Sequence, residues 1–168
     1  SGAPYKSAIT SFVVEANNDD GQFLVIDTPA GVSVRDYPFL SVCDYIFVPT
    51  SCSDADLSAT YDFLDQLDSD GLFVHSRTRK KPLVVLLPNQ VFSKKDINEV
   101  RLAFDKFPAL FGKSLPYSIK MRKAFRPDSD DKTLKQLLRA TRGYFDWMTT
   151  LISGDLRLPD KIDRLYQL

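Results

Sequence analysis

The sequence predicts an α/β fold with a doubly wound, mostly parallel sheet and helices on both of its faces. Three apolar runs carry this prediction, at 23–26, 45–48 and 83–87. No polar residue interrupts them, which is typical of strands buried on both faces. Amphipathic helical patterns separate the runs, as in βαβ units. Each run ends in polar residues, at the edge where open parallel sheets bind ligands.

The remaining elements follow from apolar spacing and from capping residues. Helices are expected at 5–17, from Ser53 or Asp54 to about Leu67, from Ser93 to about 111, through 132–142 and at 143–152. A short last strand is expected at 115–119, and 32–40 fits a mobile connection or a short helix. Residues 161–168 read as an amphipathic tail that docks on a partner or on the domain itself.

Composition favours one soluble domain over 1–168, with a tail from 153. Of the 168 residues 43% are hydrophobic and 12% aromatic, enough for a substantial core. Ser1-Gly2-Ala3 resembles a cut end or a cloning remnant. Cys43 and Cys52 flank the second run too far apart for an easy bridge, which favours a reducing, cytoplasmic compartment. We find no signal peptide and no apolar run long enough to span a membrane.

The charges divide between the two halves of the chain. Residues 1–75 carry two basic and twelve acidic residues, a net charge of −10, whereas residues 76–168 carry twenty basic and ten acidic residues, a net charge of +10. Two interpretations stay open: an acidic metal and nucleotide side with a basic partner-binding side, or one fold that mixes both halves on its surface.

Chemically active residues stand at the ends of the apolar runs. Asp27 ends the first run, and Gly31 after it permits a backbone conformation or a close approach that a β-carbon would forbid. Thr50 follows the second run and Asn89 the third. An asparagine at a strand end offers a donor and an acceptor, which suits the hydrogen-bonding edge of adenine, although a turn asparagine beside proline is the simpler interpretation from the residue alone.

Four stretches in order resemble the ParA/MinD-type, deviant-Walker (SIMIBI class) P-loop ATPases. They are FLVIDTPAG, CDYIFVPTSCSDADL, LVVLLPN at 83–89 and LPYSIKMRKAF at 115–125. The resemblance covers roughly residues 10–150. It implies a cytoplasmic ATPase that uses ATP and Mg²⁺, dimerises with ATP, and partitions or positions DNA or another cargo with a partner protein that stimulates hydrolysis.

The resemblance also implies roles for single residues. Asp27 would hold or order the metal, and the backbone amide of Gly31 would sense the γ-phosphate and change the switch loop after hydrolysis. The nucleotide-binding positions would be Thr50, Asn89, Leu115 and Pro116, with Asn89 and the backbone around 115–116 contacting the base.

The chain departs from the family in one respect. It contains no GxxxxGK[ST] or KGGxGK[ST] motif, and its seven glycines are isolated. We expect the phosphate loop upstream of residue 1, so this chain alone should not hydrolyse ATP. The alternative is a non-catalytic pseudo-ATPase interaction module. A phosphoacceptor receiver domain built on Asp27 fits less well, because an acidic pair on an earlier strand and a lysine on a later one are missing.

Two basic groups in the second half are candidates for DNA contact, which is also a property of ParA-like proteins. They are Lys120, Arg122, Lys123 and Arg126, and then Lys132, Lys135, Arg139 and Arg142 at helical spacing. A solvated helix face is the alternative. The aspartates of 54–68 read as a solvated face, with Asp54 and Asp56 more easily explained by helix capping than by a metal, and His75 as a surface histidine.

Overall fold

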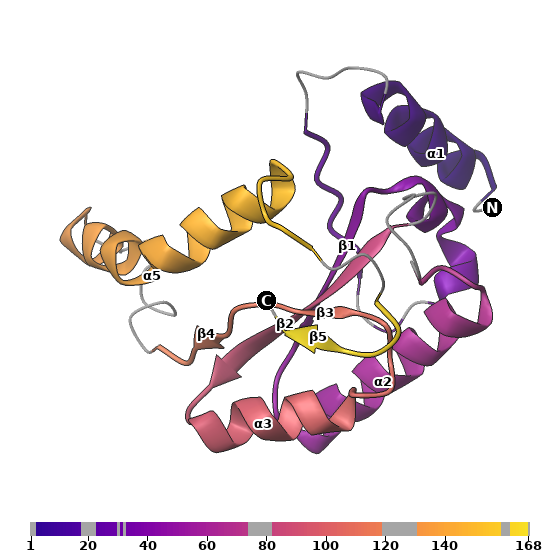
Figure 1. Ribbon diagram of the computed structural model, residues 1–168. Coiled ribbons are helices and arrows are strands. Elements are labelled where there is room, and N and C mark those ends of the chain that lie inside the picture. The colour runs from indigo at the N-terminus through magenta and orange to yellow at the C-terminus, as the bar shows by residue number, and fades with distance from the viewer. Residues whose placement is uncertain are drawn as a thin grey trace.

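The chain forms a parallel sheet flanked by helices (Figure 1). The computed structural model describes residues 3–17, 23–29, 31, 33–73, 82–118, 131–158 and 162–167. In chain order the elements are α1 (Ala3–Asn17), η1 (Val34–Asp36), η2 (Pro38–Val42), β1 (Tyr45–Thr50), α2 (Asp54–Ser69), β2 (Leu83–Val91), α3 (Lys94–Ala103), β3 (Leu110–Phe111), β4 (Leu115–Pro116), α5 (Asp131–Ile152) and β5 (Tyr166–Gln167).

Strand β2 is the centre of the sheet. The order is β1-β2-β3-β5, β4 also pairs with β2, and every described pairing is parallel. The register runs from Tyr45 opposite Leu83 to Thr50 opposite Pro88. The predicted α/β class with a mostly parallel sheet is confirmed.

Alternate side chains of β2 enter two different hydrophobic cores. Val84 and Leu86 pack with residues of α2 and α3, such as Leu64 and Val100. Leu83 and Val85 lie on the other face and pack with side chains of α5, including Trp147. Figure 1 accordingly shows α5 on one side of the sheet and α2 and α3 on the other. The apolar run predicts this arrangement, because no polar side chain has to face water.

The strand predicted at 23–26 is wrong. Residues 23–29 belong to no strand, and Phe23 and Val25 are 80% and 89% exposed. Only Ile26 packs against the first core. An apolar run forms a buried strand only where a neighbouring strand is present to pair with it, and the described part of the sheet pairs none with this run.

Other predicted boundaries shift. The segment 32–40 contains two 3-10 helices, and β2 extends to Val91, past Asn89. The helix predicted from Ser93 is confirmed as α3, but it ends at Ala103, so the end predicted at about 111 is wrong and β3 lies there instead. The two helices predicted across 132–152 are one continuous α5, because Gly143 does not interrupt it. Of 115–119 the structure describes only the first four residues, with β4 in the first two.

The carboxyl-terminal tail docks on the domain. Tyr166 and Gln167 form β5, which pairs with β3, and Ile162 is buried in the core beneath α5. The tail therefore adds a strand to the sheet. None of the helices in the described ranges combines the length and the apolarity needed to cross a bilayer.

Two glycines make a matched test of this packing. A β-carbon on Gly112 would lie 2.6 Å from the Trp147 ring and 3.1 Å from the Leu86 carbonyl oxygen, whereas one on Gly143 would meet nothing within 4 Å. We expect Gly112→Ala to lower the free energy of unfolding by about 1–3 kcal/mol through overpacking. Gly143→Ala should raise it by up to about 1 kcal/mol, because alanine favours a helix interior. Urea unfolding followed by circular dichroism measures both, and equal effects would contradict the packing of α5 on the sheet.

Candidate nucleotide-binding edge

Residues distant in sequence meet at what we call the carboxyl edge, namely the carboxyl ends of β1 and β2 together with β4. Thr50 at the end of β1 lies opposite Pro88, and the next residue of β2, Asn89, lies opposite Leu115. Pro116 follows opposite Val91. Parallel neighbours end on the same side of a sheet, so the four predicted nucleotide-binding positions come together here.

Only part of this group faces outward. Asn89 and Leu115 are half-buried and Pro116 is exposed, but Thr50 is buried, with 3% of its surface exposed. The Thr60 hydroxyl donates a hydrogen bond to Thr50 Oγ1 at 3.0 Å, and Thr50 Oγ1 donates to the Ser51 carbonyl at 3.3 Å. The Thr50 side chain therefore joins β1 to α2, and its hydroxyl proton is already used within the protein.

The amino end of α2 next to Thr50 is closed by its own side chains. Ser53 is the N-cap and accepts from the Asp56 amide at 3.2 Å, and the Ser51 hydroxyl donates to the Asp56 carboxylate. The predicted capping at this position is confirmed. Among the described residues, no group of three or more His, Cys, Asp or Glu side chains is placed to hold a metal ion.

Strand β2 carries a bulge at the carboxyl edge. Between the pairs Asn89–Leu115 and Val91–Pro116, β2 advances two residues while β4 advances one. The extra residue is Gln90, whose φ of 55° lies in the left-handed region. A non-glycine residue with positive φ is strained, and such strain is concentrated at functional sites. Bulges also re-aim the side chains that follow them.

Two aromatic side chains lie beyond the bulge. The rings of Phe92 and Tyr117 are stacked, with centroids 4.7 Å apart and planes inclined by 29°. Phe92 is 73% exposed although its neighbour Val91 is buried. The sequence patterns considered above single out neither these two residues nor Gln90. One signal for Phe92 is present in the sequence, namely an aromatic residue directly after a strand end and before a helix cap.

The Asp96 carboxylate closes the amino end of α3. It accepts hydrogen bonds from the amides of Phe92 at 2.7 Å and Ser93 at 2.9 Å and from the Ser93 hydroxyl at 2.8 Å, while Ser93 caps the helix. The bond from the Phe92 amide contributes most to lowering the pKa of Asp96, with the Ser93 hydroxyl next. Because ionised Asp96 makes these bonds, the stability they give is present at neutral pH and is lost as the pH falls below the usual aspartate range.

Asp27 and Gly31 belong to no strand of the described sheet. Asp27 is exposed on the segment 23–29, which belongs to no strand, so it does not stand at a strand tip as expected. Gly31 is exposed and has a φ of 77°, which agrees with the expected need for glycine there. The predicted convergence of three strand tips at 27, 50 and 89 is thus confirmed only for the last two.

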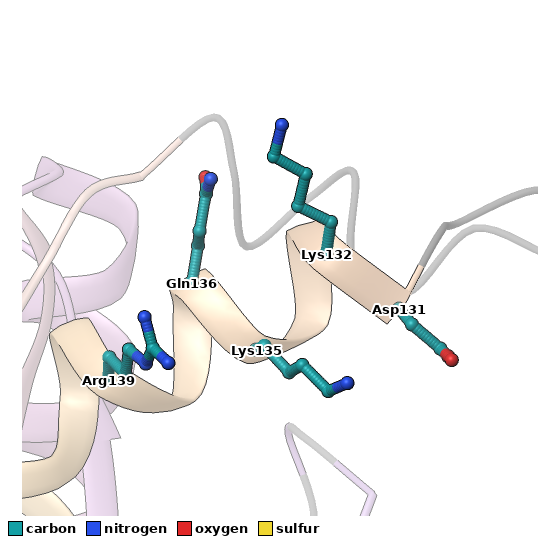
Figure 2. Close-up of a pocket in the computed structure, with 5 residues that line it drawn as sticks. All are labelled: Asp131, Lys132, Lys135, Gln136 and Arg139. Carbon is teal, nitrogen blue, oxygen red and sulfur yellow. The ribbon is translucent and has the colours of Figure 1, made fainter.

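The basic residues of α5 lie on its exposed surface. Lys132, Lys135, Arg139 and Arg142 are all exposed, and the Arg142 guanidinium lies 3.7 Å from the Asp146 carboxylate. The first three line a shallow hollow with Asp131 and Gln136. Figure 2 shows Lys135 extending away from Lys132 and Gln136, so the cations spread along the helix instead of converging on one point. Such a surface fits an extended polyanion better than a small anion.

The apolar side chains of α5 are only partly buried. Leu137 and Trp147 enter the core, but Leu134, Leu138 and Phe145 are 43–52% exposed. The other basic group, Lys120, Arg122, Lys123 and Arg126, lies outside the described residues, as does His75.

Cys43, Cys52 and Tyr144 are further reactive groups among the described residues. Cys43 and Cys52 are both free and half-buried, which agrees with the expectation that they lie too far apart for a disulfide. Burial, followed by the charge of Asp44, raises the pKa of the Cys43 thiol, which keeps it protonated and poorly nucleophilic. Burial likewise raises the pKa of Tyr144.

Comparison of the chain with protein-family models, with curated proteins and with solved structures finds no match. The features that bear on function are therefore the sequence motifs and the geometry of the carboxyl edge.

The Thr50–Thr60 pair provides a test of how β1 is fixed at this edge. Thr50→Val leaves the Thr60 hydroxyl buried without its acceptor, so we expect it to lose about 1–3 kcal/mol of unfolding free energy. Thr60→Val leaves the Thr50 hydroxyl its bond to the Ser51 carbonyl and should lose less. The double variant should lose less than the sum of the two. Thr149→Val, at an exposed position of α5, is the control and should change stability by less than about 0.5 kcal/mol. Additive losses in urea unfolding would show that the two hydroxyls are not coupled.

Proposed function

We propose that this chain supplies the base-binding and switch portion of a ParA/MinD-like ATPase, whose ATP-dependent dimerisation partitions or positions DNA or another cargo. The observation that carries the proposal is the meeting of Thr50, Asn89 and Leu115 at the carboxyl edge, in the register of β1, β2 and β4. Three motifs spread over about 65 residues of the chain thus contribute to one edge of a parallel sheet, where α/β proteins bind ligands.

Within this proposal the candidate residues have different roles. The Asn89 amide is half-buried at the edge and offers a donor and an acceptor to the base. Thr50 contributes by holding β1 against α2, since its hydroxyl is engaged there. Asp27 would order Mg²⁺ and Gly31 would sense the γ-phosphate from a segment that forms no strand, and the phosphates would need a loop whose motif these 168 residues do not contain.

A second candidate of another class is a non-catalytic interaction module. The exposed apolar residues Phe23, Leu24 and Val25 favour it, because side chains of this kind commonly mark a surface that another polypeptide covers. The two proposals differ in whether the chain has affinity for ATP.

Titration with ATP tests the base-binding role of Asn89. We expect the chain to bind ATP weakly, and Asn89→Ala to raise the dissociation constant about five- to tenfold, the effect of one lost hydrogen bond. Asn98→Ala, at an exposed position of α3, is the matched control and should bind as the unaltered chain does. Isothermal calorimetry measures all three. No binding of ATP by the unaltered chain would contradict the nucleotide proposal and leave the interaction module.

The proposed association with DNA can be tested separately through the basic residues of α5. If Lys135 and Arg139 contact phosphates, the double change to glutamate should weaken binding to a non-specific duplex. It should also reduce the slope of log affinity against log salt by about 2. Changing Lys94 and Lys95 on α3 to glutamate gives the same charge change at another exposed place. Fluorescence anisotropy at several salt concentrations measures the slopes, and equal effects of both variants would identify the basic surface of α5 as solvated.

A further inference from the structure

The aromatic platform, which we define as Phe92 and Tyr117, has no role in the account so far. Phe92 presents most of its ring to solvent while its other face is stacked on Tyr117. A large apolar ring held this way at a strand end gains little from burial in the domain itself. An exposed, backed aromatic face is what a flat ligand ring requires for stacking.

The backbone at both rings is fixed. The Phe92 amide donates to the Asp96 carboxylate at 2.7 Å, and the Tyr117 amide donates to the Val91 carbonyl at 3.0 Å. The bulge at Gln90 sets the direction in which the chain leaves β2. Strain at Gln90 is thus combined with a preformed ring pair, and preformed contacts reduce the entropic cost of binding a ligand.

The position and the charge of the platform restrict what it can bind. Phe92 follows Asn89 by three residues, which is about 10 Å of extended chain at most, and Tyr117 follows Pro116 at the same edge. The amino end of α3 beside Phe92 is occupied by the Asp96 carboxylate, so the amides of Phe92 and Ser93 are engaged and do not bind a phosphate there. The platform therefore suits an uncharged planar ring better than an anion.

We propose that Phe92, backed by Tyr117, stacks on the purine base of the nucleotide that Asn89 contacts. This inference rests on the proposed function and names the stacking residues of the same site. The phosphates would then extend from the base away from α3, toward the end of β1.

Saturation-transfer NMR on the full chain with millimolar ATP tests the platform. Saturating the protein should transfer magnetisation to the adenine ring protons, and Phe92→Ala should abolish most of that transfer. Phe92→Ala should also raise the dissociation constant for ATP about tenfold, and Phe92→Trp should restore both signals, since tryptophan provides a stacking face. Phe12→Ala is the control: Phe12 is 63% exposed on α1, which Figure 1 places far from the carboxyl end of β2.

The outcomes separate the two proposals. If the unaltered chain binds no ATP, the nucleotide proposal fails and the platform fails with it. If ATP binds and Phe92→Ala leaves the dissociation constant and the adenine signals unchanged, only the platform is overturned. The platform is also overturned if Phe92→Ala weakens the binding of inorganic tripolyphosphate as much as the binding of ATP, because the effect would then not concern the base. Phe92→Leu, which keeps an apolar side chain without a ring, should behave as Phe92→Ala does if the fold is intact by circular dichroism.

Discussion

The burial of β2 on both faces is the constraint on which the rest of the structure depends. Its residues Leu83 to Leu86 are all buried, and alternate side chains enter the two cores that hold the helices on either side. The same strand pairs with β1, β3 and β4. A change in its register would therefore move the core residues to the wrong faces and displace every strand end at the carboxyl edge.

The candidate site follows from this constraint. Parallel pairing brings the end of β1, the end of β2 and β4 to one side, and the bulge at Gln90 then redirects the chain so that Phe92 meets Tyr117. The groups left for a ligand are the Asn89 amide, the backbone of β4 and an aromatic face. Thr50 and Asp96 also lie near this edge, but both are engaged in hydrogen bonds within the protein. The Thr50 hydroxyl bonds to Thr60 and joins β1 to α2, whereas the Asp96 carboxylate closes the amino end of α3.

Residues that follow an apolar run can be singled out from the sequence, whereas residues whose conformation depends on the pairing of two distant strands cannot. A binding role for Leu115 is implied only by the family resemblance, whereas Asn89 was predictable because it follows the apolar run 83–87. Gln90 was not, since its left-handed backbone arises only when β4 pairs with β2 in a shifted register. Asp27 was placed at a strand end on the strength of Phe23 to Ile26, but an apolar run does not reveal whether a neighbouring strand is present to pair with it.

The sequence by itself determined the α/β class, the central apolar strand, the caps at Ser53 and Ser93 and the absence of a phosphate-loop motif in these residues. Each of these depends on contacts between residues close in the chain or on side-chain type. Only the tertiary structure decided that Phe23 and Val25 face solvent, that the tail adds β5, and that Phe92 and Tyr117 stack. These features depend on which distant segments pair, and local patterns of polarity do not encode that choice.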